Sequence, residues 1–168
     1  RVVRDAAGRL GKRVTLLIEG EETEVDKSVV ERLADPLTHL LRNAVGHGVE
    51  SPSQRLAIGK PESGALRLSA RHEAGGLVVE ISDDGGGLDT AKIRARAEAV
   101  DLIQPGQELT DEQVQALIFR PGFSTVTEVN DVCGRGVGLD VVREGVDALN
   151  GTLTFHSVLG KGTMFVVR

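Results

Sequence analysis

A long amphipathic segment between residues 26 and 48 most constrains how this chain can fold. Its apolar residues recur at the three- and four-residue spacing of an α-helix, at Val30, Leu33, Leu37, Leu40, Leu41 and Ala44. Asp26 or Ser28 can begin the helix, and Gly48 can end it. Pro36 lies inside the pattern and predicts a kink. A helix with one apolar face has to pack on another layer, which the rest of the chain must provide.

Alternating apolar and polar residues predict the strands of that second layer. Segments 65–72 and 77–83 alternate with a period of two, and the Glu-Ala-Gly-Gly sequence between them predicts a hairpin. Further strands are expected at 14–20, 151–158 and 162–168, and further helices at 1–11, 51–59, 90–100, 110–119 and 138–149. This order predicts one domain over residues 1–168 with an α/β (α+β) two-layer sandwich fold: a mixed, largely antiparallel sheet with helices packed on one face.

Three polar residues form a stripe along the long helix. His39, Asn43 and His47 recur at every fourth position and border the apolar face. An Asn oxygen is a hard ligand that suits Mg²⁺ held mostly by water and phosphates, and a His can donate to phosphate oxygens. The same spacing also fits polar residues at the edge of a surface helix, so the stretch alone leaves both interpretations open. A zinc site is not favoured, because two His without a third strong ligand make a poor site.

The strand over 77–83 ends on a carboxylate that is expected to point inward. Asp83 lies on the face that is otherwise apolar, and a buried charge needs a partner, such as the exocyclic amine of adenine. The glycines at 85–87 leave the backbone open to a flat ligand. The alternative is a turn in which Asp and Gly serve the backbone only. That alternative is preferred for Asp84, which we expect to be solvated, and stays open for Asp83.

A second glycine-rich segment precedes the last expected helix. Gly134, Gly136 and Gly138 offer backbone N–H groups at a helix N-terminus, where phosphate can bind, and Arg135 adds a positive charge. The segment is neither a P-loop nor a dinucleotide fingerprint, because it lacks a terminal Gly-Lys-Ser/Thr and does not follow a strand. The connection over 120–138 has the length that is typical of active-site lids.

Composition excludes several classes of protein. A net charge of −5, no Trp or Tyr and only four Phe argue against a nucleic-acid binder. No run of about eighteen apolar residues predicts a membrane span, and the single Cys133 excludes an intrachain disulfide. His72 and His156 are expected on the surface of strands. The chain begins without Met and shows no signal peptide, so we expect a fragment of a longer protein.

Five motifs, taken in order, resemble the conserved boxes of the histidine-kinase ATP-binding fold (the Bergerat-type fold), which is shared with Hsp90, gyrase and MutL. They are HLLRNAVGHGVE at 39–50, DDGGG at 83–87, FRPGFST at 119–125, GRGVGLD at 134–140 and GKGT at 160–163. The residues of these motifs are most similar to those of the catalytic domain of chemotaxis sensor histidine kinases, and the similarity covers nearly the whole chain. Each motif alone is a weak signal, but five in the right order are specific.

The resemblance implies a role for each candidate residue. Asn43 would ligate Mg²⁺, His39 and His47 would lie near the phosphates, and His39 would be the candidate for a direct catalytic role. Asp83 would hold the adenine amine. The other ATP contacts that the resemblance implies are Gly85, Gly87, Lys92, Gly134, Arg135, Gly136, Gly138 and Thr163. Residues 120–135 would form the ATP lid.

The sequence departs from the family pattern in two places. Gly46 stands where family members usually carry Asp, and a glycine within a helix costs about 1 kcal/mol relative to Ala. Val126 and Glu128 occupy a stretch of the lid where a lysine is expected. These departures put contact between the lid and phosphate in question and leave a nucleotide-binding module without catalysis as an alternative.

The resemblance implies a cytoplasmic protein-histidine kinase that uses ATP and Mg²⁺ in chemotaxis two-component signalling. It would transfer the γ-phosphoryl group to a histidine on a separate phosphotransfer domain. The implied partners are that domain and the dimerisation domain of the same kinase, and a coupling adaptor and chemoreceptors through the full-length protein. No nucleic acid or direct membrane insertion is expected, and the isolated domain should be monomeric. A conformational-clamp ATPase is the other alternative.

Overall fold

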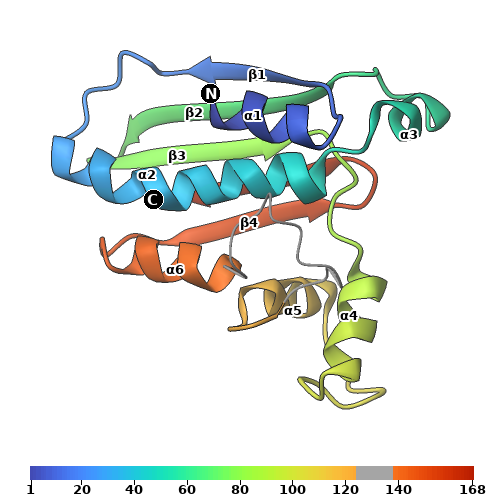
Figure 1. Cartoon of the computed structure of the whole chain (residues 1–168). Helices are drawn as coiled ribbons and strands as arrows, with labels where there is room; N and C mark the ends of the chain where they lie inside the picture. Colours follow the sequence, from blue (N-terminus) through green and yellow to red (C-terminus); the bar gives the residue numbers. More distant parts are fainter. Residues whose placement is uncertain (124–137) are drawn as a thin grey trace.

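The computed structural model describes residues 1–123 and 138–168, and its centre is a five-stranded sheet (Figure 1). The strands are β1 (Val14–Glu19), β2 (Gly64–Glu73), β3 (Gly76–Asp83), β4 (Leu153–Val158) and β5 (Gly162–Val167). Their order across the sheet is β1-β2-β3-β5-β4. β1 pairs with β2 in parallel, and all other neighbours are antiparallel. The predicted mixed, largely antiparallel sheet is therefore confirmed.

Helices cover one face of this sheet. The helices of the described residues are α1 (Val2–Arg9), α2 (Lys27–Asn43), α3 (Pro52–Ala57), α4 (Thr90–Ala99), α5 (Asp111–Gln115) and α6 (Leu139–Asp147). In Figure 1, α1, α2 and α6 lie side by side over the sheet, while α4 and α5 extend beyond its β4 edge. The opposite face carries polar residues such as Arg71, whose guanidinium pairs with Glu80 at 2.8 Å. The predicted arrangement of one helical layer on one sheet is confirmed.

The core lies between the sheet and the helical layer. Its fully buried members come from both layers. They include Leu40, Val45, Leu66, Ile81, Ile93, Val142 and Val146. A cluster of three aromatic rings, Phe119, Phe155 and Phe165, closes the core beside β4 and β5. Within residues 1–123 and 138–168, no helix is long and apolar enough to span a bilayer.

The predicted hairpin and the predicted start of the long helix are both present, and the long helix continues through Pro36. The hairpin between β2 and β3 turns on Ala74 and Gly75, whose φ values of 52° and 81° are those of a two-residue type I′ turn. Asp26 caps α2 by accepting a hydrogen bond of 2.8 Å from the Ser28 N–H. Pro36 lies within the continuous helix α2. Its ring packs on Gly145 of α6, where an added Cβ would lie 2.8 Å from Pro36 Cγ.

Candidate nucleotide-binding site

The polar stripe lies where the long helix changes its winding. α2 ends at Asn43 and continues as η1, a π-helical turn over Ala44–Gly48, in which the Val49 N–H donates to the Ala44 carbonyl at 2.8 Å. The prediction of one regular helix to Gly48 is therefore wrong for this last turn. The Lys12 ammonium donates to the carbonyls of Val45 and Gly46 at 2.8 and 2.7 Å. These bonds satisfy backbone acceptors at the end of the turn, and such turns are found frequently at functional sites.

The stripe borders the core, as the sequence predicted. His39 and Asn43 are half-buried, and His47 is exposed. His39 Nε2 is buried and has no hydrogen-bond partner among the described residues. Burial lowers the pKa of His39, the charge of Arg42 lowers it further, and Asp140 on α6 opposes both. His39 is therefore a neutral ring near pH 7 with a polar atom that faces no protein partner in the described part of the chain.

Asp83 ends β3 at the same end of the molecule. Its backbone is in register with Thr163 on β5, and a Cβ at Gly48 of η1 would lie 3.0 Å from its carboxylate. Removal from water raises the pKa of Asp83 to about 6; hydrogen bonds from the N–H groups of Gly85 and Thr163 oppose this rise, and the charges of Asp84 and Glu50 add to it. The prediction that Asp83 points inward is thus confirmed, and its carboxylate is held with little protein charge to compensate it.

The expectation that the glycines at 85–87 leave the backbone open to a ligand is wrong for Gly85 and Gly87, because other parts of the backbone fill the space that their side chains would take. The Gly85 N–H donates to Asp83 Oδ1 at 2.9 Å, and the Gly86 N–H donates to the Gly48 carbonyl at 2.9 Å. A Cβ at Gly85 would overlap that same carbonyl. Gly87 has a φ of 69° and lies against the carbonyl of Val158. Three separate parts of the chain, η1, the glycine loop and the β4–β5 turn, therefore meet at backbone distance.

Thr163 closes the site from β5. It is 8% exposed, and its hydroxyl lies 2.9 Å from the Ser157 hydroxyl. Ser157 in turn accepts a hydrogen bond of 2.8 Å from the N–H of Leu88. Ser157 was not predicted from the sequence, because a serine on an alternating strand carries no signal of its own.

Other predicted site residues are less closely tied to Asp83. Lys92 lies in the first turn of α4, with its side chain 83% exposed and its ammonium 3.8 Å from Asp89. Gly138 is the N-cap of α6. Gly134, Arg135 and Gly136, the greater part of the expected lid and the departures at Val126 and Glu128 lie outside the described residues. His72 and His156 are exposed on β2 and β4, as predicted.

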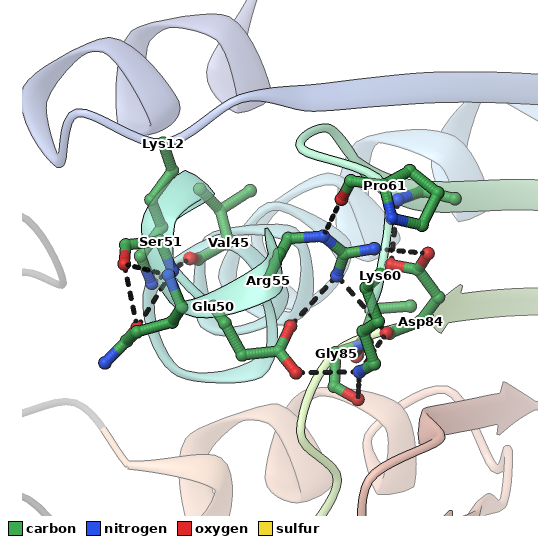
Figure 2. Close-up of polar contacts among 12 residues, drawn as sticks. Lys12, Val45, Glu50, Ser51, Arg55, Lys60, Pro61, Asp84 and Gly85 are labelled. Carbon is green, nitrogen blue, oxygen red and sulfur yellow. Dashed lines mark hydrogen bonds and ion pairs between the residues drawn. The ribbon is translucent and has the colours of Figure 1, made fainter. Parts of the chain in front are cut away.

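The expectation that Asp84 is solvated is confirmed only in part, because its side chain is 40% exposed but also has protein partners that the sequence did not predict. Asp84 Oδ2 pairs with Arg55 at 2.8 Å, and Oδ1 accepts from the Ala65 N–H at 2.8 Å (Figure 2). Arg55 is 0% exposed, although it lies on the short helix α3. Arg55 was not predicted from the sequence either, because an arginine in a short polar helix is normally on the surface.

Replacing Asp83 with Asn should stabilise the free domain at neutral pH. A carboxyl whose pKa is raised on folding gives stability that is present below its unfolded pKa, near 4, and is lost as the pH rises through about 6. Asn carries no charge, so Asp83→Asn should gain about 1–3 kcal/mol of unfolding free energy at pH 7.5 and much less near pH 4. Urea unfolding at both pH values measures this difference.

The matched control is Asp84→Asn, which removes a charge one residue away. It should lower stability at pH 7.5, because it leaves the buried Arg55 with one ion-pair partner fewer. Equal destabilisation by both substitutions would show that the charged Asp83 carboxylate does not lower the free energy of unfolding.

Residues 32–168 match the family described as Histidine kinase-, DNA gyrase B-, and HSP90-like ATPase. The chain therefore belongs to this family of ATP-binding domains, and the five motifs of the sequence fall within the match. A histidine kinase domain from the Erythrobacter litoralis EL346 blue-light activated histidine kinase has the same fold. It aligns with a TM-score of 0.52 at 16% identity, over 98% of this chain and 59% of that one.

Two relatives with higher sequence identity to this chain are both chemotaxis proteins of the same name. Chemotaxis protein CheA of Rhizobium meliloti (strain 1021) is 48% identical over 167 residues, which are 99% of this chain and 22% of that protein. Chemotaxis protein CheA of Klebsiella aerogenes is 52% identical over 163 residues, 97% of this chain and 25% of that protein. The chain thus spans about a quarter or less of the length of these relatives.

Proposed function

We propose that this chain is the Mg-ATP-binding catalytic domain of a chemotaxis-type sensor histidine kinase. It transfers the γ-phosphoryl group of ATP to a histidine on a separate phosphotransfer domain. The observation that carries this proposal is that η1, the turn that continues the Asn43 helix, meets Asp83 and its glycines at one end of the sheet through Gly48. Relatives named Chemotaxis protein CheA, similar over nearly this whole chain, support the particular kinase.

The two ends of the nucleotide are assigned to different elements. Asp83 accepts the exocyclic amine of adenine. Gly85 and Gly87 let the loop after Asp83 pack on the backbone of Gly48 and Val158, and Thr163 supports the adenine pocket from β5. His39 lies on α2, which leads away from Asp83, and His47 lies on η1; both are assigned to the phosphates. The remaining phosphate contacts are assigned to Lys92, Gly134, Arg135, Gly136 and Gly138.

The residues present fit a magnesium ion that is held together with phosphate. Within the described ranges, no group of three or more His, Cys, Asp or Glu side chains could hold a metal. The donor set is one amide oxygen, that of Asn43, which suits an ion whose other ligands are phosphates and water. Mg²⁺, when bound, neutralises phosphate charge. The protein's part is to orient the nucleotide and exclude water, with His39 beside the reacting phosphate.

The chain acts within a longer kinase. A phosphotransfer domain and a dimerisation domain of the same kinase are the proposed partners. The full-length kinase is cytoplasmic, and a coupling adaptor and chemoreceptors are its further proposed partners.

The function is tested by mixing the domain with a histidine phosphotransfer domain and γ-labelled ATP. Label should appear on the acceptor histidine and should require Mg²⁺. Release of labelled phosphate without transfer would instead indicate a conformational-clamp ATPase. Binding without either product would indicate a regulatory module.

A further inference from the structure

Arg55 is a fully buried cation whose contacts converge on the segment that follows Asp83. Its guanidinium pairs with Glu50 at 2.9 Å and with Asp84 at 2.8 Å, and its Nε donates to the Pro61 carbonyl at 2.6 Å. It also lies 3.4 Å from the Asp84 carbonyl. Figure 2 shows these groups converging from α3, the loop after it and the end of β3. Burying this charge is tolerated because most of its donors are satisfied.

Lys60 contacts the same segment and shares two partners with Arg55, the Glu50 carboxylate and the Asp84 carbonyl. Its ammonium pairs with Glu50 at 2.7 Å and donates to the carbonyls of Asp84 and Gly85 at 2.9 and 2.8 Å. The two cations therefore bind the backbone of the two residues directly after Asp83. The charges of Arg55 and Lys60 balance those of Glu50 and Asp84, so the cluster is neutral as a whole.

The orientation of this backbone decides where the Asp83 carboxylate points. The Gly85 N–H can donate to Asp83 Oδ1 only while the peptide groups of Asp84 and Gly85 keep their present direction. Lys60 and Arg55 fix those groups through their carbonyls, and the Ala65 N–H fixes the Asp84 side chain from β2. Replacing a buried ion network with apolar residues is often neutral for stability, so the network alone is weak evidence for a stabilising role. Its contacts to a ligand-facing loop indicate a role in geometry.

We propose that Arg55 and Lys60 are positioning residues that hold the loop after Asp83 in the geometry in which the Asp83 carboxylate binds the adenine amine. They thereby set the preference of the site for adenine over guanine. This inference rests on the proposed function, in which Asp83 receives the adenine amine. Neither cation is expected to contact the nucleotide. Their effect is on the direction of one carboxylate, so it should appear in the choice of base more than in binding of the phosphates.

The test compares ATP and GTP affinities of Arg55→Met, Lys60→Met and Arg55→Lys by calorimetry. Arg55→Met and Lys60→Met should weaken ATP binding about tenfold and GTP binding little, because only adenine depends on the aimed carboxylate. Arg55→Lys keeps the charge and should restore part of the preference. The matched control is Arg67→Met, which removes an arginine that pairs with Glu19 on the opposite face of the sheet. It should leave both affinities unchanged.

Each outcome decides the inference. If Arg55→Met does not fold, Lys60→Met decides alone, because its ammonium is partly exposed and its loss leaves Arg55 paired. Folded variants that keep the wild-type preference, or that lose ATP and GTP affinity equally, overturn the positioning role. A wild-type domain without any preference for ATP would overturn the base-reading function itself, which is a separate failure.

Discussion

Asn43→Ala should lower Mg²⁺-dependent phosphotransfer at least about a hundredfold, because a metal that is held by few protein ligands depends strongly on each of them. The fold should survive the change. Asn43 is half-buried at the end of α2, at the border of the core, so little packing is lost with its side chain. The free energy of unfolding should therefore change by less than about 1 kcal/mol.

Binding measurements separate the metal from the chemistry. In the wild type, Mg²⁺ should strengthen ATP binding, and removal of the ion with a chelator should reduce affinity to that of the variant. In Asn43→Ala, Mg²⁺ should have little effect. Asp35→Ala, at an exposed position of the same helix, is the matched control and should behave as wild type. A variant that melts far below wild type, or that transfers phosphate normally, would show that Asn43 is not the ligand.

The fold could be predicted from the sequence to a large extent, because the segments that form its two layers repeat apolar residues at the spacing of a helix or a strand. The long helix, the β2–β3 hairpin and the β4–β5 pair each carry a periodic pattern of apolar residues over most of their length. The π-helical turn η1 could not be predicted in this way. It depends on where backbone carbonyls find donors, and one donor is Lys12, more than thirty residues away.

The candidate site was predicted unevenly, for a physical reason. Asp83 could be found because a carboxylate on an apolar strand face conflicts with its surroundings. Arg55 and Lys60 could not, because a cation in a short polar helix or loop conflicts with nothing in the sequence. Only the structure shows that Glu50, Asp84 and backbone carbonyl groups surround these two cations. The residues proposed to bind the ligand could be found from the local sequence, while those proposed to orient them could be found only from tertiary contacts.

The domain should prefer ATP to GTP by about ten- to a hundredfold, because Asp83 can accept from only one of the two bases. Adenine presents an amine at the position where guanine presents a carbonyl oxygen. A half-buried carboxylate that faces another acceptor loses a hydrogen bond and stays desolvated, which costs about 1–3 kcal/mol. Above its pKa of about 6, Asp83 is charged and the preference should be fully developed. As the pH falls through 6, protonation lets the carboxyl donate to guanine, so the preference should narrow.

Asp83→Ala should weaken ATP binding and largely erase the preference, since it removes the acceptor without touching the phosphate contacts. Glu80→Ala is the matched control, because Glu80 lies three residues earlier on the opposite face of β3 and pairs with Arg71. Calorimetric titration of both nucleotides into the three proteins at pH 7.5 measures the effect, and repeating it at pH 5.5 measures its pH dependence. Equal affinity of the wild type for ATP and GTP, or an effect of Glu80→Ala as large as that of Asp83→Ala, would remove Asp83 from the base-binding site.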